Sequence, residues 1–178
     1  AETTPYRWII LFGVWLLYFS FGVIAASMAP LVRPVIVALD LDNARMGVVL
    51  GAWPLVYVAA AIPCGAFLDK LGPRKALLFG VAIIAASGAA RGLATSEFKL
   101  ILAVAIFGLG GPVISIGAPK LVSLWFAERE RGMAMGIYIT GSNLGAVAAL
   151  SLTNGVMMPL LGQDWRLVLF CYAGFALA

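Results

Sequence analysis

The sequence contains no histidine and very little charge. Histidine is absent from the 178 residues and only 11% of them are charged, whereas ordinary globular domains carry about 25% charged residues. Without histidine, the Ser-His and Cys-His nucleophile pairs, His-ligated zinc and haem with an axial histidine are excluded. The two cysteines, Cys64 and Cys171, lie far apart, so no disulfide framework, Cys-x-x-Cys pair or thiolate metal site is indicated. Enzymes of these kinds are therefore excluded, we expect no bound cofactor or metal, and an enzyme of any other kind ranks last among the possible functions.

Long apolar runs dominate the sequence. Nine apolar and aromatic residue types make up 63% of the chain, and the mean hydropathy is +1.03. A membrane-spanning helix needs roughly 20 apolar residues, and stretches such as 81–86 are continuously apolar, unlike the alternating strands of a membrane barrel. The sequence therefore predicts an all-α integral membrane protein. Its expected helices cover residues 8–37, 44–68, 76–94, 100–126, 133–161 and 165–178.

The last of these runs is too short to cross a hydrocarbon core of about 30 Å. The chain also begins without Met, and its first run is too long for a signal peptide. We therefore expect a piece of a longer multi-pass protein.

Basic residues in the connections predict the orientation in the membrane. One side of the predicted bundle carries the larger set and the other the smaller. These sets are Arg7, Lys70, Arg74, Lys75, Arg129 and Arg131 against Arg45, Lys99 and Arg166. Because cytoplasmic loops are enriched in Lys and Arg, we expect a bacterial inner (plasma) membrane protein with a cytoplasmic amino terminus. The net charge of +4 fits this bias without any nucleic acid as partner.

Two pairs of segments indicate an internal repeat of three helices. Residues 29–33 (Ala-Pro-Leu-Val-Arg) resemble residues 118–122 (Ala-Pro-Lys-Leu-Val), and the Gly47/Gly51 spacing recurs at Gly132/Gly136. Inverted repeats of this size occur within transporter halves. Glycines four residues apart favour close helix packing over direct ligand contact. The same interpretation extends to other glycines of the fourth and fifth predicted helices: Gly108, Gly110, Gly111, Gly117, Gly141 and Gly145.

The connection at residues 65–77 carries the most specific motif. Its sequence is Gly-Ala-Phe-Leu-Asp-Lys-Leu-Gly-Pro-Arg-Lys-Ala-Leu, which resembles the loop signature G-x-L-a-D-r-x-G-r-k-x-x-l of the major facilitator superfamily. The matching positions are Gly65, Asp69, Gly72, Arg74 and Leu77, with Lys70 matching in charge, whereas Phe67, Leu68 and Pro73 depart from the pattern. The resemblance implies the amino-terminal six-helix bundle, residues 1–178, of a twelve-helix transporter built from inverted three-helix repeats.

A second connection supports this resemblance, and two positions depart from it. Trp125-Phe126, Glu130-Arg131-Gly132 and Gly136 look like the family's loop between helices four and five. Val104 stands where the family often has an arginine, and no Gly-Pro motif follows Gly145. These departures make an embedded ion pair and multidrug antiport less favoured.

The loop can act as a conformational latch. A carboxylate at Asp69 beside Lys70, Arg74 and Lys75 can form charge-assisted hydrogen bonds that hold one arrangement of helices and break in another. Gly65 and Gly72 complete the predicted latch, since Gly72 permits the tight turn and Pro73 can begin the next helix. The alternative is a solvated basic loop that serves only orientation.

The predicted spans contain basic residues and no carboxylate near a midplane. Lys120 and Arg33 are candidates to attract an anionic solute into a low-dielectric cavity. Alternatively Lys120, Arg33 and Arg91 reach the membrane surfaces, as long basic side chains do near helix ends. Uncharged cavity candidates lie on helices one, two, four and five, which the resemblance places around the central cavity. They are Tyr18, Trp53, Tyr57, Ser115, Tyr138, Thr140 and Asn143.

The sequence thus predicts a secondary active transporter that moves a small anionic solute by alternating access. Residues 141–145 partly resemble the helix-five segment of nitrate and nitrite porters, and carriers of cyanate type or of small carboxylates stay equally open. The expected partners are the solute, the lipid bilayer and a missing carboxyl-terminal six-helix half or a second copy. The alternative is a non-transporting membrane subunit that reuses the fold as a scaffold.

Overall fold

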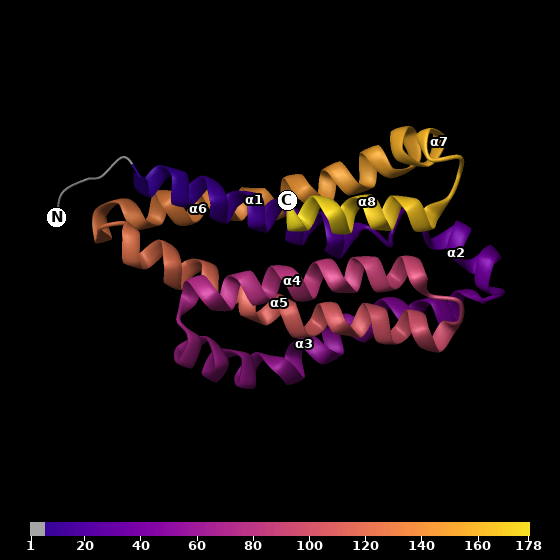
Figure 1. The fold of residues 1–178 in the computed structure, drawn as a ribbon, viewed down its shortest axis with the longest axis horizontal. Coiled ribbons are helices and arrows are strands. Elements are labelled where there is room, and N and C mark those ends of the chain that lie inside the picture. Colours follow the sequence, from indigo (N-terminus) through magenta and orange to yellow (C-terminus); the bar gives the residue numbers. More distant parts are fainter. Residues whose placement is uncertain (1–5) are drawn as a thin grey trace.

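The computed structural model describes residues 6–178, and that part of the chain is helical without any strand. The elements are α1 (Tyr6–Ala26), α2 (Val32–Leu39), α3 (Asn43–Leu71), α4 (Pro73–Leu93), α5 (Glu97–Trp125), α6 (Glu128–Leu152), a π-helical turn (Thr153–Met157), α7 (Met158–Leu160) and α8 (Trp165–Leu177). Five segments are long and apolar enough to span a membrane: α1, α3, α4, α5, and α6 continued through Leu160. They run side by side along the long axis in Figure 1. The predicted all-α membrane class is confirmed.

Two of the expected helices are interrupted. The single helix expected over 8–37 ends at Ala26 and resumes as α2 at Val32. Pro30 lies in this break, where its missing N–H and its restriction of the preceding residue disfavour a continuous helix. The helix expected over 133–161 contains the π-helical turn. There the Thr153 hydroxyl donates to Ala149 O at 2.5 Å, which competes with the backbone ladder.

Side-chain caps and a glycine turn determine three of the helix starts. The carboxylate of Asp42 accepts a hydrogen bond from Arg45 N at 2.7 Å, and the hydroxyl of Ser96 accepts one from Lys99 N at 3.4 Å. Both residues therefore cap a helix amino terminus, α3 and α5 respectively. Gly72 has a φ of +77°, which is accessible to glycine, and Pro73 is the first residue of α4.

The helix pairings have the pattern expected of an inverted repeat. α1 packs along α6, α3 packs along α5, and α4 packs along both α5 and α8. If α1 corresponds to α5 and α3 corresponds to α6, the α1–α6 pair is equivalent to the α5–α3 pair. The two three-helix units are α1, α3 and α4, followed by α5, α6 and α8. Each unit thus contributes one helix to the α1–α6 pair and one helix to the α3–α5 pair.

Glycine accounts for the closeness of these pairs. A Cβ atom on Gly145 would lie 2.1 Å from Phe19 O, one on Gly22 would lie 2.0 Å from Ser142 O, and one on Gly108 would lie 2.5 Å from Trp53 O. Those atoms are backbone and cannot rotate away, so these glycines allow α1 to approach α6 and α3 to approach α5. The predicted packing role is confirmed at these positions and also at Gly110, Gly111, Gly117 and Gly141, where a Cβ would likewise clash.

The repeat glycines behave differently. A Cβ on Gly47, Gly51, Gly132 or Gly136 would meet nothing within 4 Å among the described residues. The prediction that these four pack against a neighbouring helix is therefore wrong within this part of the chain. They lie on helix faces that the bundle leaves open.

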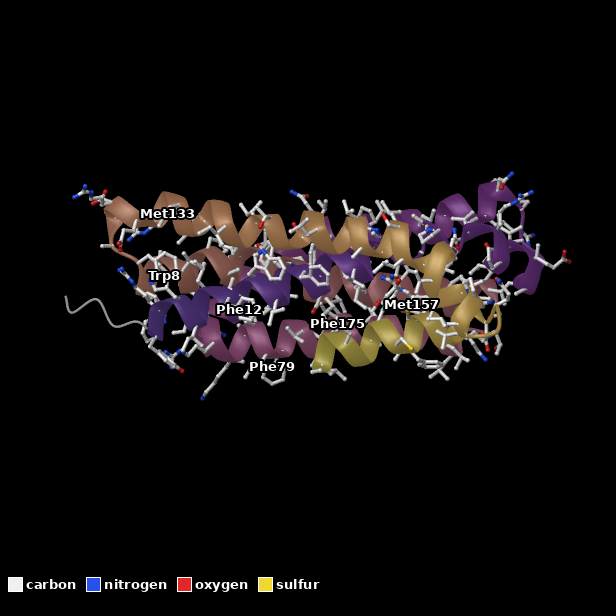
Figure 2. The ribbon with its side chains drawn as sticks, turned by 90° about the horizontal axis from the view of Figure 1, so that it is seen from above. Trp8, Phe12, Phe79, Met133, Met157 and Phe175 are labelled. Atoms are coloured by element: carbon white, nitrogen blue, oxygen red, sulfur yellow. The ribbon has the colours of Figure 1, made fainter. Side chains whose placement is uncertain are left out.

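The outside of the bundle is apolar along most of its length. Figure 2 shows Phe12, Phe79 and Phe175 projecting from α1, α4 and α8, and about half of the surface of each side chain is exposed. Charged side chains gather toward the two ends of the same view. An apolar belt between charged ends is the surface that a lipid bilayer requires.

Candidate functional site

A chain of aromatic rings crosses four helices. Tyr138 of α6 lies 4.8 Å from Tyr18 of α1, measured between ring centroids. The contacts continue from Tyr18 to Phe21 (6.1 Å), from Phe21 to Phe107 of α5 (5.1 Å), and from Phe107 to Trp53 of α3 (5.4 Å). Trp53 in turn lies 6.1 Å from Tyr57. We refer to these six residues as the aromatic chain.

The aromatic chain contains most of the predicted uncharged candidates. Tyr18 and Tyr138 are buried, whereas Trp53 and Tyr57 are half-buried. Gly111 leaves room for Tyr57, because a Cβ there would lie 2.8 Å from Tyr57 Cδ2. One turn further along α5, the hydroxyl of Ser115 donates to Gly111 O at 3.0 Å. The structure thus joins α1, α3, α5 and α6 through one surface of rings and hydroxyls.

Two members of the aromatic chain were missed by the sequence reasoning. Phe21 and Phe107 carry no polar group, and in so apolar a sequence no local signal separates them from ordinary core residues. The one available hint is spacing, because Phe21 follows Tyr18 by three residues and therefore shares its helix face. Phe107 becomes visible only when α5 is placed beside α1 and α3.

Three predicted candidates lie away from the aromatic chain. Thr140 accepts a hydrogen bond from Trp15 Nε1 at 3.0 Å and donates to Ile137 O at 2.7 Å, so it joins α6 to α1 at an exposed position. Asn143 is exposed on α6, on the face opposite the one that packs on α1. Arg33 is exposed on α2, beyond the break that follows α1.

Lys120 pairs with the predicted latch carboxylate. Its Nζ lies 2.5 Å from Asp69 Oδ1, which connects the end of α5 to the end of α3. Lys70, Arg74 and Lys75, the partners expected within the loop, form no ion pair with Asp69 in the described chain. Both paired side chains are substantially exposed, and exposed ion pairs contribute about 0–1 kcal/mol. The assignment of Lys120 to the solute cavity stays a prediction.

A second ion pair joins α1 to α6 at the same end. Both terminal nitrogens of Arg7 donate to the carboxylate of Glu130, at 2.5 and 3.2 Å. The guanidinium carbon also lies 5.6 Å from the ring centroid of Trp8 and 5.5 Å from that of Phe126. Bidentate pairing and ring contacts make this connection stronger than an isolated exposed pair. The sequence reasoning used Arg7 only for orientation.

Arg91 is a buried cation that the sequence reasoning placed near a membrane surface. Its side chain is 1% exposed on α4. One terminal nitrogen donates to Ile24 O at 2.9 Å and to Ser27 Oγ at 3.2 Å, and the guanidinium carbon lies 5.4 Å from the Phe107 ring centroid. Nε and the other terminal nitrogen have no hydrogen-bond partner among the described residues. Arg91 is buried because its side chain lies between the last turn of α1 and Phe107 of the aromatic chain.

Carboxylates lie at helix ends throughout the described chain. Asp42 and Asp164 cap helices, Asp40 follows α2, Asp69 is in the last turn of α3, and the three glutamates stand in first turns. The middle of the bundle therefore presents aromatic rings and hydroxyls, with Arg91 behind them. Such a surface can donate hydrogen bonds to an anion, and it offers no carboxylate for proton transfer.

The chain matches a family model and is similar to several transport proteins. The model described as Major Facilitator Superfamily matches residues 10–178. The "Probable L-galactonate transporter" of Escherichia coli K12 is 29% identical over 72% of this chain and 28% of its own length. The "Probable anion transporter 3, chloroplastic" of Arabidopsis thaliana is 30% identical over 83% of this chain and 29% of its own length. The "Nitrate/nitrite transporter NrtP" of a Picosynechococcus species is 30% identical over 79% of this chain and 26% of its own length.

A solved structure shares the fold. A bacterial homolog to the human lysosomal transporter Spinster, in an inward-facing and unoccupied conformation, superposes with a TM-score of 0.86 at 20% sequence identity, covering 99% of this chain and 42% of that chain. The chain spans less than a third of the length of the curated relatives named above.

Proposed function

Because the chain belongs to the Major Facilitator Superfamily, we propose that it is the amino-terminal bundle of a secondary transporter for a small anionic solute. The observation that carries the proposal is the aromatic chain, which joins α1, α3, α5 and α6 where the described residues place no carboxylate. Relatives named for galactonate, nitrate and nitrite, sulfoacetate, and oxalate and formate support an anion as the solute.

The aromatic chain forms one wall of the proposed site. Hydroxyls of Tyr18 and Tyr57 donate to the anion, and each hydrogen bond contributes about 1 kcal/mol. The missing carboxyl-terminal half, or a second copy, supplies the opposite wall. Rocking of the two bundles about this midplane site then gives alternating access.

Coupling to a proton through Asp or Glu does not use the middle of this bundle. The described carboxylates lie at helix ends, so coupling uses the other half, the solute itself or exchange of one solute for another. The end that carries Arg7, Lys70, Arg74 and Lys75 faces the cytoplasm in this proposal, because the positive-inside rule favours it.

Uptake by the full-length reading frame in proteoliposomes tests the proposal. The panel contains galactonate, nitrate, sulfoacetate, oxalate and a neutral sugar. We expect saturable uptake of at least one anion. Tyr57→Phe, which removes one hydroxyl, should raise KM about fivefold to tenfold, equivalent to about 1–1.4 kcal/mol.

Tyr172→Phe is the matched control. Its hydroxyl lies 2.7 Å from Thr153 Oγ1 near the π-helical turn, away from the aromatic chain, so KM should stay unchanged. Uptake of the neutral sugar alone would contradict the anionic solute. No uptake of any solute by a folded protein would favour the non-transporting subunit instead.

A further inference from the structure

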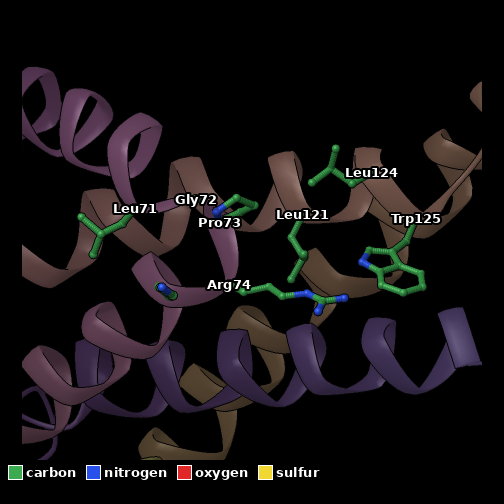
Figure 3. Close-up of a pocket in the computed structure, with 8 residues that line it drawn as sticks. Leu71, Gly72, Pro73, Arg74, Leu121, Leu124 and Trp125 are labelled. Carbon is green, nitrogen blue, oxygen red and sulfur yellow. The ribbon is translucent and has the colours of Figure 1, made fainter.

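A pocket of about 520 Å³ opens at the end of the bundle that carries the predicted latch loop of residues 65–77. It lies between the start of α4 and the last turns of α5, as Figure 3 shows. Apolar side chains make its floor and two basic residues stand on its rim. The lining residues are Leu71, Gly72, Pro73, Arg74, Lys75, Leu121, Leu124 and Trp125. We refer to it as the inner-end pocket.

Aromatic residues place the inner-end pocket at the membrane surface. Tyr6 lies 5.8 Å from Trp125, and Trp8 lies 5.5 Å from Phe126, both measured between ring centroids. Tyr and Trp are enriched where a membrane protein meets the lipid headgroups. The pocket therefore lies at headgroup depth, with its apolar floor extending toward the hydrocarbon.

The rim carries positive charge without a protein counterion. Arg74 and Lys75, the two basic residues of the rim, have no carboxylate within ion-pair distance among the described residues. Asp69 and Glu130 at the same end are already paired, with Lys120 and Arg7 respectively. The Arg74 guanidinium carbon lies 5.2 Å from the centroid of the Trp125 ring, which holds its charge over the apolar floor, as Figure 3 shows.

We propose that the inner-end pocket binds an anionic phospholipid. The lipid phosphate lies between Arg74 and Lys75, and the first part of an acyl chain lies along Leu121, Leu124 and Trp125. Charge complementarity selects an anionic headgroup over a zwitterionic one, and the apolar floor selects a lipid over free phosphate. The proposal is independent of the transported solute.

Native mass spectrometry of the purified full-length protein tests the proposal. The protein is titrated with phosphatidylglycerol or with phosphatidylcholine of identical acyl chains. We expect phosphatidylglycerol to bind at least tenfold more tightly. The double variant Arg74→Gln/Lys75→Gln should lose most of this preference, because each basic side chain near the headgroups contributes about fivefold.

Arg45→Gln/Lys99→Gln is the matched control, since it removes the same charge at exposed positions of the opposite end. It should retain the preference. Leu124→Glu is a second variant, because Leu124 is 68% exposed and tolerates substitution. A carboxylate at that position should repel the anionic lipid.

Three outcomes would overturn the proposal. The first is equal binding of the two phospholipids by the wild type. The second is the same loss in both double variants, which would indicate a general charge effect. The third is full displacement of the lipid by millimolar inorganic phosphate, which would indicate a soluble phosphate site. Uptake is not measured, so failure here leaves the proposed transport function untouched.

Discussion

Arg91 shows what one charge costs inside a membrane bundle. Its guanidinium is fully buried beside the last turn of α1, and two of its three nitrogens lack a partner in the described chain. The bonds to Ile24 O and Ser27 Oγ, the Phe107 ring and the negative end of α1 offset part of the desolvation. Buried charges are costly unless all of their hydrogen bonds are satisfied. Arg91 therefore fixes the carboxyl-terminal end of α1 without adding much net stability.

This balance predicts the order of two variants. Arg91→Met should stay within about 1 kcal/mol of the wild type, because it removes the buried charge and Ile24 O still accepts the Ser27 hydroxyl at 2.8 Å. Arg91→Lys should lose about 2–3 kcal/mol, because it keeps the charge and loses the planar fork. Thermal unfolding of the full-length protein in detergent measures both. A lysine variant more stable than the methionine variant would show that the cation at the end of α1 outweighs its desolvation.

The helices α3 and α6 each have two distinct faces. On α6, Ala134, Tyr138, Gly141, Gly145 and Ala149 are buried, whereas Gly132, Gly136, Asn143 and Val147 follow one another on the opposite side and are exposed. On α3, Gly47, Leu55, Val58 and Ile62 form the corresponding exposed side. Glycine spacing alone does not distinguish these faces. The neighbouring helix decides which glycines permit close approach.

Gly145 and Gly13 therefore respond differently to one added methyl group. A Cβ on Gly145 would lie 2.1 Å from Phe19 O, so Gly145→Ala forces α1 away from α6 and should cost about 1–3 kcal/mol. Gly13 has nothing within 4 Å of its Cβ position, so Gly13→Ala should be neutral or stabilising by up to about 1 kcal/mol. Unfolding temperatures of the two full-length variants provide the measurement. Equal losses would mean that α1 and α6 are not held by this close contact.

The sequence is sufficient to predict most helices and insufficient to predict two interruptions. Apolar runs identify the spans, because lipid requires every backbone group to be satisfied within the chain. The break after Ala26 and the π-helical turn from Thr153 lie inside the predicted spans 8–37 and 133–161. A hydropathy average depends only on side-chain types, so it does not detect the loss of a backbone hydrogen bond. Pro30 accounts for the first interruption, and the hydrogen bond from the Thr153 hydroxyl to Ala149 O accounts for the second.

At the scale of the whole molecule, pairings between distant segments decide the candidate site. Tyr18, Trp53, Tyr57 and Tyr138 could be singled out because polar aromatic residues are conspicuous in apolar spans. Their connection through Phe21 and Phe107 could not, because it depends on α5 lying between α1 and α3. The Asp69–Lys120 pair likewise joins residues 51 positions apart. From the sequence, the charge of Lys120 was compatible with a position in a solute cavity or at the membrane surface.

The Asp69–Lys120 pair links the ends of α3 and α5, so in the proposed transporter its effect belongs to the conformational equilibrium of the whole molecule. An exposed pair worth about 0–1 kcal/mol can shift a two-state equilibrium by up to about fivefold. We expect Asp69→Asn and Lys120→Ala each to lower the maximal uptake rate two- to fivefold while KM stays near the wild-type value. The exchanged variant Asp69→Lys/Lys120→Asp should recover most of that rate, because it restores the pair.

Uptake kinetics in proteoliposomes at low and high salt separate the latch from a solute-binding role for Lys120. Salt screens an exposed pair, so high salt should lower the wild-type rate toward that of Asp69→Asn. A lysine that binds the anion predicts a different pattern: Lys120→Ala raises KM, Asp69→Asn does not, and the exchanged variant shows no recovery. That pattern would move Lys120 from the latch to the solute cavity.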